Sequence, residues 1–244
     1  MPWMTINGTQ VQFRDGETVL AAARSGGIEI PSLCFRPGLG HHGSCRLCLV
    51  EILAGGRPGL AASCTLPAAE GLVVEAGSER VIQSRRMVLG LLLARSPDAK
   101  PLRELSEKLG AQEFPPRPDA RGCVLCGLCV RACRAVGQNA INFSGRGRSR
   151  RVTVPFDLPP GDCLGCRACE NVCPAGVIKV VESRGRITIL PWQSELDTVC
   201  CSKCGASMGS RPQWESLEKI FTPSSPRTGL CPACRRRFQA AFHG

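Results

Sequence analysis

Two stretches of the chain carry the same ladder of four cysteines, and this repeat restricts the possible folds more than any other feature. Residues 123–133 and 163–173 both read C-x-x-C-x-x-C-x-x-x-C, so the second ladder begins 40 residues after the first. An apolar pair follows each ladder, ending at Ile141 in one case and at Ile178 in the other. The repeat predicts two equivalent halves of one small domain.

The spacing within each ladder indicates a [4Fe-4S] cluster. Three thiolates two residues apart can bind three irons of a cubane, whereas the fourth cysteine begins the following helix and binds the other cluster. We therefore expect crossed ligand sets. The first is Cys123, Cys126, Cys129 and Cys173, and the second is Cys163, Cys166, Cys169 and Cys133. The alternatives, structural zinc or disulfides, would not need a duplicated ladder, and Gly127 suits a backbone that passes close to a cluster.

Another group of four cysteines precedes the ladders. Its members are Cys34, Cys45, Cys48 and Cys64. Four thiolates from one long loop and one distant position are typical of a [2Fe-2S] site, although the first gap is longer here than in plant-type ferredoxins. The loop contains Gly38, Gly40, Gly43 and Ser44, which let backbone amides point at the sulfurs. Zinc is the alternative, but Cys64 is expected in a strand, which favours the ferredoxin arrangement.

His41 and His42 lie inside this loop, and they raise the question of a Rieske centre. Such a centre replaces two cysteines by two histidines on one iron. Because all four thiols are already present, we expect both histidines to face solvent.

The last group consists of two C-x-x-C pairs, Cys201/Cys204 and Cys231/Cys234. Two such pairs supply the four thiolates of a structural zinc site in a ribbon-like knuckle. A rubredoxin-like iron or a further iron–sulfur centre is the alternative. Cys200 is the leftover thiol, and the C-x-x-C phase favours Cys201 as the ligand.

The charge of the chain has to be considered together with these thiols. The 31 Lys and Arg exceed the 20 Asp and Glu by +11, which by itself suggests nucleic acid or an anionic surface as a partner. Four occupied thiolate sites at about −2 each would reduce this to roughly +3. We therefore expect most of the basic excess to compensate for cofactors, and we predict no nucleic-acid partner.

No uninterrupted run of apolar residues is long enough to span a membrane, and the first residues lack the pattern of a secretory signal. The odd number of 17 cysteines suits metal ligation better than complete disulfide pairing. These features predict a cytoplasmic protein with reduced thiols.

Hydrophobic patterns predict an α+β chain. A hairpin is expected around Asn7-Gly8, a helix over 17–24, and strands over 49–53, 60–64 and 72–75, followed by helices over 79–95 and 102–109. Two strands are expected around a basic tip at 145–151, and a short helix is expected over 213–220. Four parts follow. They are a [2Fe-2S] ferredoxin-like domain (1–78), a helical bridge without a cluster (79–118), a 2×[4Fe-4S] ferredoxin domain (119–190) and a zinc-ribbon-like tail (191–244).

Three blocks of this sequence together resemble one known family. They are Gly43 to Ile52 around two of the first cysteines, the Leu-rich helix Arg86 to Leu93, and Cys126 to Arg134. The family comprises the diaphorase small subunit of NAD-linked hydrogenases and the N-terminal iron–sulfur parts of the complex I large peripheral subunit and of iron-only hydrogenases. The resemblance covers about residues 1–185, and it implies a β-grasp fold for the first domain and a bacterial-type ferredoxin fold for the ladders.

One departure from that family concerns a cluster that the relatives commonly hold through one His and three Cys, just after the Leu-rich helix. The corresponding stretch, Ser96 to Leu105, contains neither His nor Cys. The resemblance therefore implies that this cluster is missing here.

The resemblance also implies the function. We expect a non-catalytic electron-transfer subunit of a multi-subunit, flavin-containing, NAD(P)H-linked oxidoreductase. One partner would be a flavoprotein that oxidises NAD(P)H, and the other a hydrogenase, formate dehydrogenase or other reductase, with complexes of the electron-bifurcating type included. The alternatives are the iron–sulfur subunit of a succinate/fumarate-type oxidoreductase and a nucleic-acid-binding redox regulator. The sequence contains no catalytic constellation and no convincing nucleotide-binding fingerprint.

Overall fold

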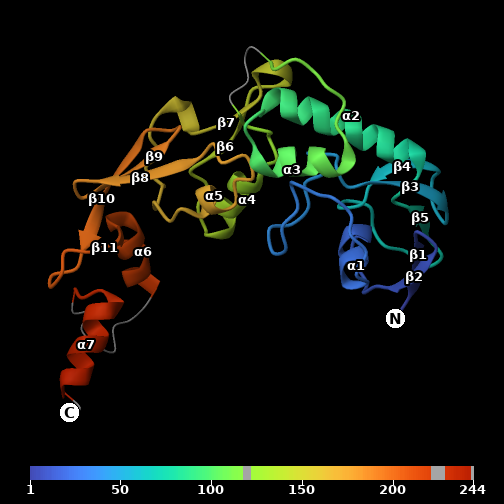
Figure 1. Cartoon of the computed structure of the whole chain (residues 1–244). Helices are drawn as coiled ribbons and strands as arrows, with labels where there is room; N and C mark the ends of the chain where they lie inside the picture. Colours follow the sequence, from blue (N-terminus) through green and yellow to red (C-terminus); the bar gives the residue numbers. More distant parts are fainter. Residues whose placement is uncertain (118–121, 221–228, 243–244) are drawn as a thin grey trace. The chain divides into compact units, whose positions relative to one another are not determined.

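The computed structural model describes residues 1–117, 122–220 and 229–242. The chain divides into two compact units. The N-terminal unit comprises residues 1–131 with 174–176, and the C-terminal unit comprises residues 132–173 and 177–244. Figure 1 shows their elements in sequence colours. The expected boundary between residues 118 and 119 lies outside the described residues.

A five-stranded mixed sheet forms the first part of the N-terminal unit. Its strands follow the order β2-β1-β5-β3-β4, and β1 pairs with β5 in parallel while the other pairs are antiparallel. The strands are β1 (Trp3–Ile6), β2 (Thr9–Gln12), β3 (Leu49–Ala54), β4 (Gly59–Ala62) and β5 (Val73–Glu75). Asn7 and Gly8 both have positive φ, at 52° and 75°, as a two-residue hairpin turn requires, so the predicted hairpin is confirmed.

Helix α1 (Val19–Ser25) packs its apolar face into the core of this sheet, which is a β-grasp arrangement. Leu20 is completely buried, and Met4 and Val74 of the strands belong to the same core. The helix begins two residues later than expected because the Thr18 side chain caps it, accepting a hydrogen bond from the Ala21 amide.

Helices α2 (Glu79–Arg95) and α3 (Lys100–Leu109) follow the sheet, as predicted. The segment after α3 runs alongside α2 in the same direction, since the amides of Gln112 and Arg117 donate to the carbonyls of Arg86 and Ala94 in α2. A Cβ at Gly90 would lie only 1.9 Å from the carbonyl oxygen of Gln112, so this close approach requires glycine. The helical bridge is therefore a packed structure even though it carries no cysteine.

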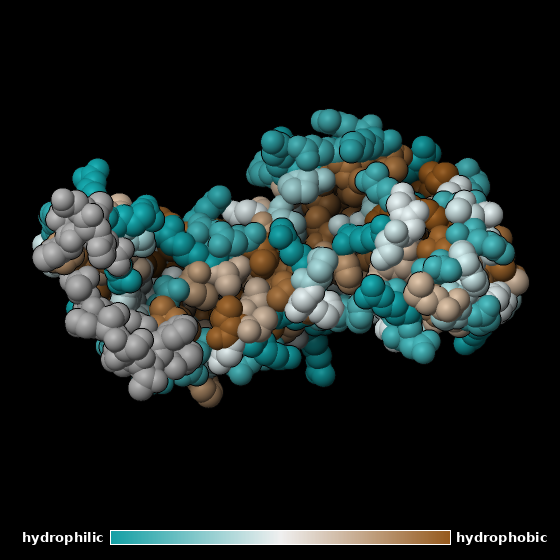
Figure 2. All heavy atoms as spheres, turned by 90° about the horizontal axis from the view of Figure 1, so that it is seen from below, coloured by the Kyte–Doolittle hydropathy of each residue, from teal (hydrophilic) through white to brown (hydrophobic). Residues whose placement is uncertain are grey.

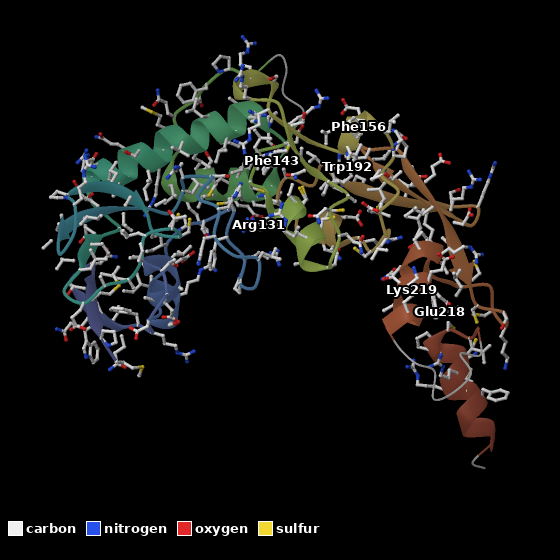
Figure 3. The ribbon with its side chains drawn as sticks, turned by 180° about the vertical axis from the view of Figure 1, so that it is seen from behind. Arg131, Phe143, Phe156, Trp192, Glu218 and Lys219 are labelled. Carbon is white, nitrogen blue, oxygen red and sulfur yellow. The ribbon has the colours of Figure 1, made fainter. Side chains whose placement is uncertain are left out.

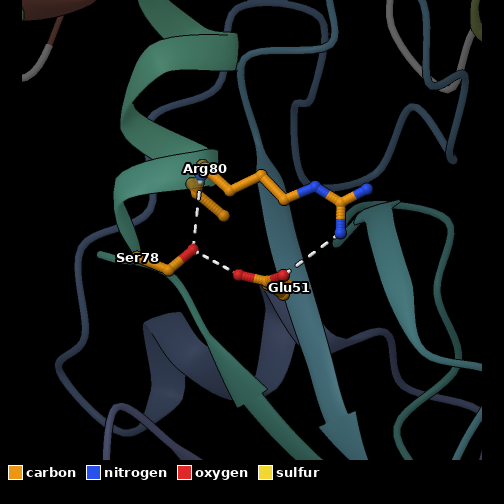
Figure 4. Close-up of polar contacts among 4 residues, drawn as sticks. Glu51, Ser78 and Arg80 are labelled. Atoms are coloured by element: carbon orange, nitrogen blue, oxygen red, sulfur yellow. Dashed lines mark hydrogen bonds and ion pairs between the residues drawn. The ribbon is translucent and has the colours of Figure 1, made fainter.

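The start of α2 is fixed to the sheet by a small polar group (Figure 4). Ser78 caps the helix by accepting from the Val81 amide at 3.3 Å, and its hydroxyl donates to Glu51 of β3 at 2.6 Å. Arg80 adds an ion pair to Glu51 at 3.3 Å. Both the serine and the arginine lower the pKa of Glu51.

Helix α4 (Leu128–Ala135) follows the first cysteine loop, and the division between the two units falls within it. Helix α5 (Ala168–Asn171) occupies the matching place in the second repeat. Between them, strands β6 (Asn142–Ser144) and β7 (Arg151–Thr153) pair in antiparallel fashion around the turn η1 (Gly147–Ser149), as expected, and η2 (Pro155–Asp157) follows β7.

The C-terminal unit contains a four-stranded antiparallel sheet that the sequence analysis did not anticipate. Its strands follow the order β11-β10-β9-β8. They are β8 (Lys179–Ser183), β9 (Arg186–Leu190), β10 (Ser194–Cys200) and β11 (Ser207–Ser210), and helices α6 (Arg211–Ile220) and α7 (Pro232–Phe242) follow. Arg184-Gly185 between β8 and β9, both with positive φ, was the available hairpin signal.

No helix among the described residues is long and apolar enough to cross a membrane. The face drawn in Figure 2 mixes hydrophilic and hydrophobic side chains.

Candidate cofactor sites

The four cysteines of the first group come together in the N-terminal unit. Cys34, Cys45, Cys48 and Cys64 are each only 1–2% exposed. Hydrogen bonds with the thiols of Cys45 and Cys64 lower the pKa of Cys34 to about 2. The Cys64 thiol likewise lowers the pKa of Cys48 to about 6, and Cys45 and Cys64 have raised pKa values in return. The four buried thiols thus lie close enough to one another to shift each other's pKa values.

Backbone amides point at these sulfurs, as the glycine-rich loop led us to expect. The amides of Cys45 and Ser44 both contribute to lowering the pKa of Cys34. The Leu33 amide donates to Cys45 Sγ at 3.4 Å. Gly43 has a φ of +68° just before Ser44, a conformation that glycine adopts without strain. This inward orientation suits sulfur ligands that carry negative charge.

The prediction that Cys64 lies in a strand is wrong. Strand β4 ends at Ala62, and Cys64 follows in a turn. Ser63, which is fully buried, holds this turn against the other thiols by donating its amide (2.9 Å) and its hydroxyl (2.7 Å) to the Cys48 carbonyl. The turn places Cys64 beside Cys48 without extending the sheet.

Arginine side chains donate hydrogen bonds to backbone carbonyls next to the cysteines. Arg85 of α2, only 6% exposed, donates to the carbonyls of Leu47 (3.0 Å) and Leu49 (2.6 Å), on either side of Cys48. Burial lowers the pKa of Arg85, whereas the charge of Cys48 raises it. Arg95, at the end of the same helix, donates to the Cys123 carbonyl at 2.7 Å.

Arg131 on α4, which Figure 3 labels, uses all five of its N–H donors to bind backbone carbonyls. Three bonds go to the loop that begins at Cys34 and two to the first cysteine ladder, so one side chain joins two cysteine loops of the N-terminal unit. The acceptors are the carbonyls of Cys34 (2.5 Å), Leu39 (3.1 Å), Gly40 (2.8 Å), Cys126 (3.4 Å) and Gly127 (3.3 Å).

The two ladders have the same backbone conformation at equivalent positions. In the first, Leu125 and Gly127 have φ of 54° and 69°, and in the second, Gly165 and Arg167 have φ of 64° and 61°. Each ladder therefore carries left-handed residues immediately before and after its second cysteine. This conformation turns successive amides toward one side, as an anion-binding loop requires.

A cavity in the C-terminal unit is lined by Cys133, Cys163, Cys166 and Cys169, the four cysteines that we expect to act as the second ligand set. Burial raises the pKa of Cys169 to about 12 and also raises that of Cys163, and the charge of Cys133 contributes to both shifts. Cys173 is not among the described residues that line this cavity. The four thiols suit an iron–sulfur cluster, since iron binding would favour their deprotonated form.

Cys201, Cys204, Cys231 and Cys234 form a compact group near the C-terminus, with sulfur atoms all within 4.8 Å of one another. The sulfurs of Cys204 and Cys231 are 3.7 Å apart, close to the edge of about 3.8 Å that a tetrahedron with 2.3 Å zinc–sulfur bonds would have. This spacing suits one metal ion, because the thiolates of a cubane bind four separate irons and spread further apart.

Backbone amides also support the C-terminal group. The Cys231 amide donates to Cys201 Sγ at 3.3 Å and lowers the pKa of that thiol to about 6. Cys200 is exposed, and its sulfur lies 3.6 Å from the Thr198 hydroxyl, outside the group. The structure therefore brings Cys201 into the group, as the C-x-x-C phase predicted.

A β-grasp domain with four buried thiols, followed by a duplicated cysteine ladder, defines an iron–sulfur electron-transfer protein. Family comparisons agree. The 2Fe-2S iron–sulfur cluster binding domain matches residues 3–79, and the 4Fe-4S dicluster domain matches residues 122–177.

The chain is 38% identical to a chain in a crystal structure of an NAD+-reducing [NiFe]-hydrogenase in the H2-reduced state. That match covers 63% of this chain and 75% of the other, with a TM-score of 0.56. The chain therefore belongs to the family of iron–sulfur subunits of NAD(P)H-linked oxidoreductases, as its sequence blocks predicted.

Curated relatives of other kinds share the same region. A subunit of the NADH-quinone oxidoreductase of Rhizobium meliloti (strain 1021) is 30% identical over 85% of this chain. The NADP-reducing hydrogenase subunit HndD of Solidesulfovibrio fructosivorans is 34% identical over 72% of it. The chain covers only 28% and 35% of these proteins, about a third or less of their length.

Proposed function

We propose that this chain relays electrons between a flavoprotein that oxidises NAD(P)H and a catalytic subunit such as a hydrogenase, a formate dehydrogenase or another reductase. The observation that carries the proposal is the cavity lined by thiols from both ladders, because four cysteines from two repeats around one space suit a cubane cluster. The family relationship supports the choice of NAD(P)H-linked partners. We place this function in the cytoplasm.

The proposal assigns a cluster to each group of iron–sulfur cysteines. Cys34, Cys45, Cys48 and Cys64 would hold a [2Fe-2S] cluster. Cys133 would join the second ladder around one [4Fe-4S] cluster, and Cys173 would join the first ladder around the other. Bound clusters would accept and donate single electrons, and the protein would set their potentials through burial, amide bonds to sulfur and nearby charge.

We also propose that the chain works without the cluster that its relatives hold through one His and three Cys. Residues 96–105 supply neither ligand type. Electrons would then pass directly between the [2Fe-2S] site and the first ladder. The bonds from Arg131 to both of these loops support a fixed geometry for that step.

For the C-terminal group, we propose a single structural zinc ion held by Cys201, Cys204, Cys231 and Cys234. Zinc has no redox chemistry of its own and strongly stabilises small cysteine-rich folds. Replacing Cys201 by Ser should release the zinc and unfold this part of the chain, whereas Cys200→Ser should leave the zinc content unchanged. Loss of zinc from Cys200→Ser alone would contradict the assignment.

Metal analysis of anaerobically purified protein tests the proposal. One [2Fe-2S], two [4Fe-4S] and one zinc site predict about ten irons and about one zinc per chain. EPR spectra of the reduced protein should resolve one binuclear and two cubane signals. A third cubane signal would contradict the missing cluster, and a colourless, iron-free protein would refute the proposed function.

A further inference from the structure

Two buried hydrogen-bond donors next to the second ladder lack any partner among the described residues. They are the indole nitrogen Nε1 of Trp192 and the hydroxyl of Ser194, whose residue is only 2% exposed. Both residues line the same cavity as Cys133, Cys163, Cys166 and Cys169 (Figure 3 labels Trp192). Because buried polar groups are almost always hydrogen-bonded, something that occupies this cavity is expected to accept from them.

The position of Ser194 makes the missing acceptor more specific. Ser194 begins β10 and pairs across the hairpin with Ile189, which is 1% exposed and lines the cavity too. Leu196, two residues later and so on the same face of the strand, lies nearest to the position that a Cβ on Gly165 of the second ladder would occupy. Ser194 is only 2% exposed and lies beside these apolar side chains, so an unpaired hydroxyl there would be unfavourable.

The chemistry of Trp192 restricts the partner further. An indole N–H can only donate, so its partner has to be an acceptor. The thiols that line the cavity become thiolates when they bind iron, and a [4Fe-4S] cluster adds inorganic sulfide. Negatively charged sulfur is an acceptor that both donors could share.

We propose that Trp192 and Ser194 donate hydrogen bonds to sulfur atoms of the [4Fe-4S] cluster at the second ladder, and thereby raise its reduction potential. This inference rests on the proposed function, and it adds that two side chains of the protein set the reduction potential of one cluster. Reduction adds one electron to the cluster, and hydrogen bonds stabilise the more negative form more strongly. The donors keep their protons in this step.

The proposal also assigns a role to the unexpected sheet. Trp192 lies in the turn between β9 and β10, and Ser194 begins β10, so both lie beyond residues 3–79 and 122–177 that the two domain families match. The ladder would supply the ligands, whereas the following sheet would set the potential of the cluster.

Redox titration of the iron-loaded chain, followed by EPR, tests this proposal with Trp192→Phe and Ser194→Ala. The signal of the second ladder is identified by its loss in Cys166→Ser. Each variant should reduce the ratio of reduced to oxidised cluster at a fixed potential by up to about tenfold, which is a shift of about 59 mV for one electron. The other two clusters should keep their potentials.

Matched controls remove the same groups elsewhere in the C-terminal unit. Trp214→Phe deletes an indole N–H that donates to the Met208 carbonyl at 3.0 Å, and Ser207→Ala deletes an exposed hydroxyl of β11. Neither residue lines the cavity. Both controls should leave the potential of the second cluster unchanged.

The outcomes separate the inference from the proposed function. Full iron content with unchanged potentials in both variants would overturn the inference, because the two donors would then be hydrogen-bonded to a buried water and not to the cluster. Absence of iron from the second ladder in the unaltered protein would overturn the proposed function. If a variant loses its cluster, ENDOR on the unaltered protein provides a second test. Absence of any exchangeable proton coupled to the second cluster would also overturn the inference.

Discussion

The two cysteine ladders share their spacing and their left-handed backbone positions, but the protein supports them in different ways. In the first, Cys126 and Cys129 are 7–8% exposed, and Arg131 binds the carbonyls of Cys126 and Gly127. The equivalent of Arg131 in the second ladder is Asn171, at the end of a helix of only 4 residues. All four cysteines of the second ladder are half-buried.

The C-terminal sheet supports the second ladder in place of an arginine. The Ser210 hydroxyl donates to the Leu164 carbonyl inside the ladder. A Cβ on Gly165 would lie 3.0 Å from Cβ of Ser210 and 2.8 Å from Leu196 Cδ1, so the sheet is in direct contact with the loop. A duplicated ligand motif can therefore hold two clusters in unequal surroundings, which lets their potentials differ.

The largest effect should come from replacing the two cysteines that we expect to bind the cluster of the opposite ladder. Cys133→Ser should remove or convert the cluster of the second ladder and leave the first intact, because Cys133 lines the second cavity. Cys173→Ser should do the reverse. Each change should affect up to about four irons, measured by iron analysis and EPR. If Cys173→Ser altered only the second cluster, the crossed assignment would be wrong.

Gly165→Ala should test the contact between the sheet and the second ladder. The new methyl group would clash with Leu196 and Ser210, and Gly165 also has a φ of +64°. Overpacking and the left-handed conformation together should lower the free energy of unfolding of the C-terminal unit by about 2–4 kcal/mol. Denaturant unfolding, monitored by the visible absorbance of the cluster at the second ladder, measures this effect.

Gly137→Ala is the matched control for that change. Gly137 has a φ of +79°, but nothing lies within 4 Å of its would-be Cβ. Only the backbone cost of about 1–2 kcal/mol should remain. Equal destabilisation by both variants would show that the sheet does not pack tightly against the second ladder.

Arg131→Lys should loosen the loop that begins at Cys34, which Arg131 joins to the first ladder, without removing the positive charge. Lysine cannot reproduce a planar fork with five donors, and bonds from charged groups contribute about 1.5–3 kcal/mol each. Amide hydrogen exchange over residues 34–40 should accelerate by about tenfold or more. Arg134→Lys, which loses one exposed bond of 3.5 Å to Asn139, should not change it. Equal rates of amide exchange in the two variants would show that Arg131 does not hold this loop in place.

The smallest effect should come from Glu51. This residue lies outside both ladders, so changing it shows how much stability a polar contact contributes where no cysteine ladder is involved. Its pKa is lowered in the folded chain, so its ionised form stabilises the protein above the unfolded pKa, and this contribution is lost as the pH falls through the folded value. Glu51→Gln should slightly reduce the stability of the N-terminal unit at neutral pH, and the difference should shrink on acidification. Denaturant unfolding at several pH values tests this, and a constant difference would contradict it.

Several local features could be predicted because the sequence specifies them within a few residues. The Asn7-Gly8 hairpin and helix α2 follow from turn residues and apolar spacing. The position of Cys64 could not be predicted, because its turn depends on Ser63 binding the carbonyl of Cys48, 15 residues earlier. The sheet β8–β11 was not predicted. Ile187 and Ile189 alternate as a half-buried strand requires, but so short an apolar pattern does not specify which strands will pair with it.

The sequence by itself determined which atoms can hold metal, because ligand chemistry depends on residue type and on spacing over a few positions. The tertiary structure alone decided what surrounds those sulfurs. Arg131 meets the loop of Cys34 across 97 positions, and Ser210 meets Leu164 across 46. Contacts over such separations arise only when the chain packs, since no local pattern encodes which distant donor will reach a given carbonyl.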